Sequence, residues 1–120
     1  MKERLYAIAT VVSMLFVAGC GSYPAPTERL TGAEAALRGA NEVGALQIPR
    51  AALHLKLAEE QIEKAKRYMQ DGYNQRAELA LRRARADAEL ALAIAHEHKT
   101  QEKTEAARQE LAKVKAQYGR

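Results

Sequence analysis

The chain has 120 residues, enough for one domain, and its formal net charge is +4 at pH 7. Alanine and charged helix-forming residues dominate, tryptophan is absent and phenylalanine occurs once, a bias typical of long helices with a thin core. This composition excludes a globule with a deep pocket. Acids alternate with the cations along the chain, so the charge does not indicate nucleic-acid binding.

Residues 1–19 are predicted to be a cleavable signal peptide. Lys2 and Arg4 precede a largely apolar stretch of 14 residues, residues 5–18. As a helix this stretch would measure about 21 Å, which is too short for a ~30 Å hydrocarbon core. The small residues Ala18 and Gly19 place the cleavage after Gly19.

The only cysteine follows this segment, and Val17-Ala18-Gly19-Cys20 resembles the lipobox of bacterial lipoproteins. The resemblance implies that Cys20 is lipidated, becomes the mature N-terminus and anchors the protein in a membrane, where two or three acyl chains hold firmly. An ordinary secretory signal would instead leave an unpaired thiol in an oxidising compartment. Gly21 stands where an aspartate usually retains lipoproteins at the inner membrane. The resemblance therefore implies the outer membrane of a Gram-negative bacterium, on its periplasmic side by default, with exposure at the cell surface as the alternative.

Residues 20–26 are predicted to form a lipidated tether, because Pro24 and Pro26 oppose helix formation. Three helices are expected after it. The first begins at Thr27, as N-cap, and ends near Gly44; the second covers about Arg50 to Asp71, after Pro49 and before the C-cap Gly72; the third begins near Asn74.

The second and third expected helices each carry small and apolar residues four and three positions apart. This pattern predicts an antiparallel hairpin with an alanine-rich, coiled-coil-like seam, made by Ala51, Leu55, Ala58, Ile62, Ala65 and Met69 against Ala77, Leu81, Ala84, Ala88, Ala91 and Ala95. The fold class is thus all-α, with a small three-helix domain over residues 27–96. The first helix is expected to use Leu30, Ala33, Leu37 and Ala40, and to meet Leu53, Leu57, Leu79, Leu90 and Ile94.

Residues 97–120 are expected to be a polar, then amphipathic, helical extension. The stretch His96–Thr104 has no apolar residue, whereas Ala107, Leu111, Val114 and Tyr118 form a new stripe, rotated by about a third of a turn from the seam. The extension is predicted either to project as a lone helix or to bend and fray near Thr100. Its candidate partner-contact residues, for another protein or for a homo-oligomer, are Leu111, Val114 and Tyr118.

The hairpin also matches part of the tetratricopeptide pattern. Tyr68, Ala77, Leu81 and Ala84 stand at the repeat's spacing around Gly72, but no second copy follows, and a solenoid needs about three units. A module of this type that binds peptides or proteins is therefore one alternative function, and a peptidoglycan-associated accessory factor is the other.

A second resemblance covers about half of the chain, from Gly44 to Ala95. Gly44, Ala45 and Pro49 precede alanine-seamed helices in a way that resembles the family of domain of unknown function 4398 (DUF4398), small helical proteins of proteobacterial envelopes. Ile48 departs from the alanine common before that proline. The resemblance implies lipoproteins, or domains coupled to OmpA-like peptidoglycan-binding modules, with no established enzyme activity. An OmpA-like envelope protein or peptidoglycan is therefore the expected partner.

No motif indicates catalysis, so neither an enzyme activity nor a cofactor or metal is expected. His96 and His98 would point ~200° apart on a helix, and His54 stands alone. His98 and Glu102, four residues apart, are expected to form a hydrogen bond in solvent; weak metal binding is the alternative for this pair. A candidate basic patch is either a solvated surface or a contact for lipid headgroups, peptidoglycan carboxylates or an acidic protein; its residues are Arg76, Arg82, Arg83 and Arg85. The sequence thus favours a non-enzymatic structural or adaptor lipoprotein.

We predict that the native protein purified from cells begins at Cys20 and carries acyl chains on that residue. Mass spectrometry of the intact protein checks this, because acylation and loss of residues 1–19 both change the mass. An intact leader or an unmodified thiol would contradict the lipobox interpretation.

Overall fold

The computed structural model describes residues 22–119, and this part of the chain is helical without strands. Its elements are α2 (Thr27–Glu42), the short 3-10 helix η1 (Ala45–Gln47), α3 (Pro49–Gln70) and α4 (Asn74–Tyr118). The predicted all-α fold is confirmed. Gly19 and Cys20, on which the cleavage and anchor predictions rest, lie outside the described residues.

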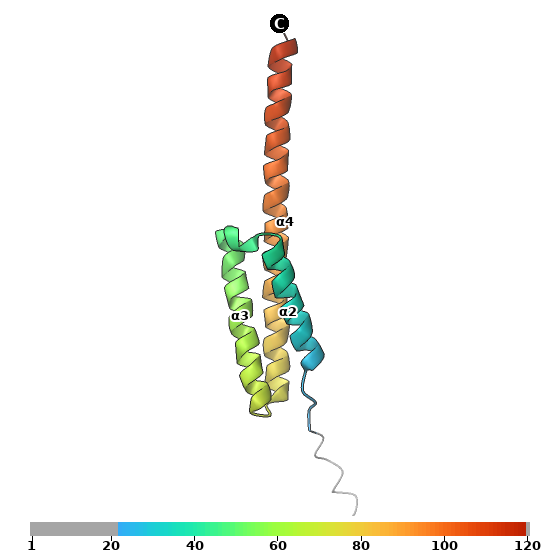
Figure 1. Cartoon of the computed structure of the whole chain (residues 1–120), viewed down its shortest axis with the longest axis vertical. Helices are drawn as coiled ribbons and strands as arrows, with labels where there is room; N and C mark the ends of the chain where they lie inside the picture. Colours follow the sequence, from blue (N-terminus) through green and yellow to red (C-terminus); the bar gives the residue numbers. More distant parts are fainter. Residues whose placement is uncertain (1–21, 120) are drawn as a thin grey trace, which may run out of the picture.

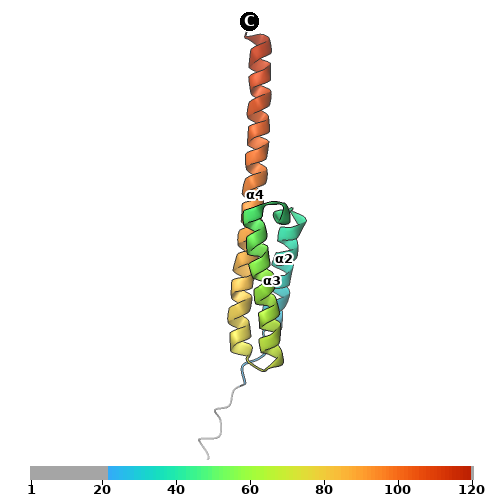
Figure 2. The same ribbon diagram turned by 90° about the vertical axis from the view of Figure 1, so that its left-hand side faces the viewer.

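Helices α3 and α4 form an antiparallel hairpin, and α2 lies along one side of it (Figures 1 and 2). Helix α4 is central, since it packs against both of the other helices, while α2 and α3 touch less extensively. The chain enters the bundle beside the α3–α4 turn, where the Asn74 side-chain amide donates a hydrogen bond of 2.7 Å to the carbonyl oxygen of Tyr23. The C-terminus lies at the opposite end of the molecule (Figure 1).

The residues at the helix ends explain where the chain turns. Gly44 and Gly72 have φ values of 85° and 77°, a left-handed backbone conformation that glycine adopts without steric cost. Pro49 occupies the first turn of α3, where its missing N–H costs nothing. The predicted N-cap was wrong by one residue: Pro26 is the N-cap of α2, and Thr27 is already helical.

The seam between α3 and α4 is made of the predicted residues. Eleven of the twelve are buried, and Met69 is half-buried at the turn end. Alanine at most seam positions lets the two backbones approach closely, at the expense of apolar area per residue. From α2, Ala33 and Ala40 are fully buried, while Leu30 and Leu37 pack partly buried against the same core.

The prediction that the hairpin leucines contact the first helix was wrong for three residues. Leu53, Leu79 and Leu90 are exposed, whereas Ile94 is buried. The reason is that α2 covers the other side of the hairpin, the side that carries Lys66 and Glu78, which contact α2 through ion pairs. The face formed by the opposite edges of α3 and α4 is left uncovered by α2.

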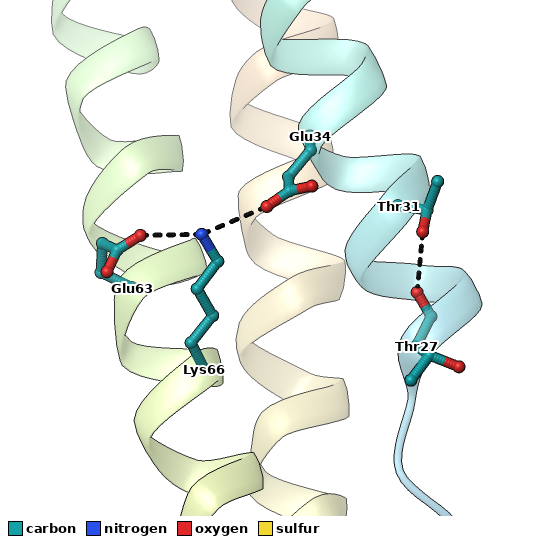
Figure 3. Close-up of polar contacts among 5 residues, drawn as sticks. All are labelled: Thr27, Thr31, Glu34, Glu63 and Lys66. Atoms are coloured by element: carbon teal, nitrogen blue, oxygen red, sulfur yellow. Dashed lines mark hydrogen bonds and ion pairs between the residues drawn. The ribbon is translucent and has the colours of Figure 1, made fainter.

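Lys66 links α2 to α3 on the covered side (Figure 3). Its Nζ atom lies 3.0 Å from a Glu63 oxygen on its own helix and 3.2 Å from a Glu34 oxygen on α2. These hydrogen bonds raise the pKa of Lys66 above its ordinary value. In the same view, the Thr31 hydroxyl bonds back to the Thr27 carbonyl within α2.

Helix α4 continues without a break to Tyr118. Of the two alternatives predicted for the extension, the lone projecting helix is therefore confirmed, and the bend near Thr100 does not occur. The Thr100 and Thr104 hydroxyls donate to the carbonyl oxygens of His96 and Thr100, one helical turn earlier, without interrupting the helix. Side chains one turn apart lie near each other along this segment: Glu105 with Arg108, and His98 with Glu102 at 3.6 Å, which is too long for the predicted hydrogen bond. Every residue from His96 to Gly119 is exposed.

We predict that Ala84→Leu destabilises the bundle by about 1–3 kcal/mol, because Ala84 is fully buried in the seam and a larger side chain must push the helices apart. Urea unfolding followed by circular dichroism measures the change. Ala93→Leu is the matched control, since Ala93 is an exposed position of the same helix and the change there adds the same atoms. Equal stability of the two variants would contradict a close-packed alanine seam.

Candidate functional site

Residues 22–119 hold no group of three or more His, Cys, Asp or Glu side chains able to bind a metal ion. Within the same range, a helix with the length and apolarity to cross a bilayer is also absent. The candidate sites are therefore surfaces. Three of them stand out: the projecting end of α4, an arginine–glutamate cluster between α2 and α4, and a groove on the uncovered face of the hairpin.

The projecting end of α4 carries the predicted partner-contact residues. Leu111, Val114 and Tyr118 are 54%, 41% and 84% exposed, and with Ala107 they fall on one face of the helix at spacings of four, three and four. No other element reaches this segment, as Figure 2 shows. It is thus an apolar face that the rest of the described chain leaves without a partner.

The arginine–glutamate cluster surrounds the one buried charged side chain of the described residues. Glu78 on α4 is 7% exposed, accepts a hydrogen bond from Arg82 and forms an ion pair of 3.0 Å across the interface with Arg29 of α2. Arg85 lines the same surface cavity and pairs with Glu89 at 2.7 Å. Because each arginine here has an acidic partner, the cluster holds α2 to α4 and is largely neutralised.

The groove between α3 and α4 on the uncovered face has a different charge. A surface cavity of about 150 Å³ is lined by Lys64, Arg76 and Arg83, together with Gln61, Tyr68, Leu79 and Ala80. None of the three cations makes an ion pair with another described residue, and no acid lines the cavity. We call this surface the cationic groove.

The four arginines of the predicted basic patch therefore divide between two faces. Arg82 and Arg85 join Arg29 on the α2 side, while Arg76 and Arg83 join Lys64 in the cationic groove. Neighbouring residues of a helix are rotated by about 100°, so adjacent arginines need not share a surface. Lys64 was not among the residues of the predicted patch. Its position one turn before Tyr68 and off the seam is the feature of the sequence that could have indicated it.

His54, which stood alone in the sequence, has a partner across the hairpin. Its Nδ1 atom lies 3.0 Å from a carboxylate oxygen of Asp87 on α4. The pair joins α3 and α4 on the uncovered face, further from the turn than the cationic groove. Its role in the described structure is to connect the two helices, since no third polar group joins it.

These features define a class: a small helical bundle, alanine-seamed, with a long helix projecting from one end. The chain belongs to the family described as domain of unknown function (DUF4398), whose family model matches residues 28–107, two thirds of the chain. The resemblance stated from residues 44–95 is thereby confirmed. No curated protein and no solved structure matches the chain.

We predict that Glu78→Gln destabilises the bundle by about 1–3 kcal/mol, because it removes the charge that two arginines share at a buried position. Urea unfolding is the measurement. Glu89→Gln, which removes an exposed partner of Arg85 on the same helix, is expected to change stability by less than about 0.5 kcal/mol. A larger effect at position 89 than at position 78 would contradict the role assigned to Glu78.

Proposed function

We propose that the protein is a non-enzymatic adaptor of the cell envelope, tethered to the outer membrane through lipidated Cys20 and binding a partner protein through the projecting end of α4. The separation of the two ends is the observation that carries this proposal. The chain enters at the α3–α4 turn, beside Asn74, and the apolar stripe lies at the far end of the same helix.

The helix fixes the distance between these ends. At 1.5 Å per residue, Leu111 lies about 55 Å and Tyr118 about 66 Å along the helix axis from Asn74. Cys20 precedes Tyr23 by three residues, a reach of about 10 Å. A lipid anchor at Cys20 would therefore hold the bundle near the bilayer and present the stripe well away from it, in the periplasm.

The chemistry of the stripe favours a protein partner over peptidoglycan. An amphipathic helix that offers apolar residues at these spacings fits a hydrophobic groove or another helix. A polymer of sugars and short peptides offers no continuous apolar groove of that kind. An OmpA-like protein of the envelope remains the partner class that the family resemblance implies.

A second copy of the chain is the less favoured partner. The stripe has four apolar positions over about three turns, less than the three to four heptads of a sustained coiled coil. Lys103, Arg108 and Lys115 flank it against one acid, Glu110, so two such helices would bring more like charges than opposite charges together. These cations favour a partner groove with an acidic rim.

The tetratricopeptide-like alternative has less support. Ala77, Leu81 and Ala84, three residues of that pattern, are buried in the α3–α4 seam and serve helix packing. The match at these positions is accounted for by the hairpin itself.

We predict that a photo-crosslinking amino acid at position 111 or 114 yields a discrete protein adduct in intact cells. Positions 112 and 116, on the opposite face of the same exposed helix, are the matched controls and are expected to give little or none. Immunoblotting of the crosslinked chain is the measurement. Equal yields from both faces would show that the stripe does not select a partner.

The same prediction has a second arm. Truncation after Thr100 is expected to abolish co-purification of the crosslinked partner while leaving the melting transition of the bundle unchanged, because residues 101–119 are exposed. A partner that is retained by the truncated chain would place the binding surface elsewhere.

A further inference from the structure

We propose that the cationic groove, formed by Lys64, Arg76 and Arg83, binds the phosphate groups of anionic phospholipids at the bilayer next to the tether. The inference rests on the proposed function in one respect, that the turn end of the bundle faces a membrane. It adds a second contact, which would set how the bundle is oriented on the lipid surface.

The charge and size of the groove suit a phosphate group. Three cations from two helices converge on one cavity without an acidic residue in its lining. At about 150 Å³ the cavity is small for a drug-sized ligand but has room for a group of the size of a phosphate. Elsewhere on α4 the comparable arginines, Arg82 and Arg85, are already paired with glutamates.

Two tyrosines hold the cations at the edges of the groove. Lys64 Nζ lies 5.8 Å from the centre of the Tyr68 ring, and Arg76 Cζ lies 5.2 Å from the centre of the Tyr73 ring. The two rings meet edge to face, with centres 6.5 Å apart and planes at 84°. Tyrosine beside lysine and arginine is the combination found at membrane–water interfaces, where the ring sits at the level of the headgroups.

The position of the groove points to the bilayer as the source of phosphate. Arg76 is in the first turn of α4, two residues after Asn74, whose side chain bonds to Tyr23. A membrane-inserted residue 20 lies within about 10 Å of Tyr23 along the chain. This is comparable with the Debye length of about 8 Å at physiological salt, so the groove would feel the surface charge of the headgroups.

A second copy of the chain fits the groove poorly. Two copies paired groove to groove would bring like charges together, and Asp87 on the same face is already paired to His54. The glutamates nearest the groove, Glu59, Glu60 and Glu63, line a neighbouring cavity beside Lys64 on α3, and none of them lines the groove itself. An anionic surface is therefore the better complement.

The test uses the full chain with Tyr73→Trp, which supplies the single tryptophan of the protein beside the groove. The protein is reconstituted into phosphatidylcholine vesicles with or without phosphatidylglycerol, both containing a headgroup-attached nitroxide quencher. We expect stronger tryptophan quenching in the anionic vesicles and its reversal by high salt. Each cation removed, beginning with Arg83→Gln, is expected to lower the docked-to-free ratio by about fivefold.

The matched control removes the same charge far from the groove. The triple variant Lys64→Gln, Arg76→Gln, Arg83→Gln is compared with Lys99→Gln, Lys103→Gln, Arg108→Gln on the projecting helix; all six residues are exposed, and melting curves verify that both variants fold. Loss of anion-dependent quenching in the first triple alone supports the proposal. Equal quenching in neutral and anionic vesicles, or equal loss in both triples, overturns it.

Two further experiments distinguish lipid binding by the groove from peptidoglycan binding and from the lipid anchor at Cys20. Sedimentation with purified peptidoglycan is run in parallel, and a groove variant that loses peptidoglycan while keeping its quenching in anionic vesicles would overturn the lipid assignment. A Cys20→Ser form is measured beside the native chain. If Cys20 is not acylated in cells, the proposed function fails, yet the difference between anionic and neutral vesicles still tests the groove.

Discussion

Close packing of small side chains between α3 and α4 is the constraint on which the rest of the structure depends. Ala58, Ala84 and Ala88 are fully buried, so the two backbones run close together along the whole length of α3. Such a seam is only as long as the shorter helix. Since α3 has 22 residues and α4 has 45, the seam stops at Ala95 and the remainder of α4 must leave the bundle. The exposed apolar stripe is thus a consequence of a mismatch in helix length.

The sequence predicted the hairpin because its signals are local and repeat. The three- and four-residue spacing places seam residues on one side of each helix, and Gly72 and Pro49 mark the turns with conformations that few other residues adopt. The side on which α2 packs could not be predicted in this way. It depends on contacts between distant residues, such as Arg29 with Glu78, and the leucines at 53, 79 and 90 gave the opposite indication.

The same distinction between local signals and contacts of distant residues applies to the candidate sites. The stripe at Leu111, Val114 and Tyr118 is a property of one helix, so its residues could be selected from spacing alone. The members of the cationic groove could not be selected in this way. The groove combines Lys64 of α3 with Arg76 and Arg83 of α4, whereas Arg82 lies on the other face. The expectation of a bend near Thr100 came from helix propensity, which counts less here: α4 is already nucleated in the bundle, and extending a helix lacks the entropic cost of starting one.

A continuous helix between the two ends couples reach to direction. Each residue of α4 adds about 1.5 Å and turns the following side chains by about 100°, so the stripe's distance from the α3–α4 turn and the direction it faces cannot vary independently. The cationic groove gives this coupling a physical meaning: a bundle held at one point by a tether can rotate freely, whereas a second contact on one face of α3 and α4 removes that freedom. The stripe would then face a fixed direction relative to the bilayer, and a partner of matching orientation could bind without first paying the entropy of orienting the rod.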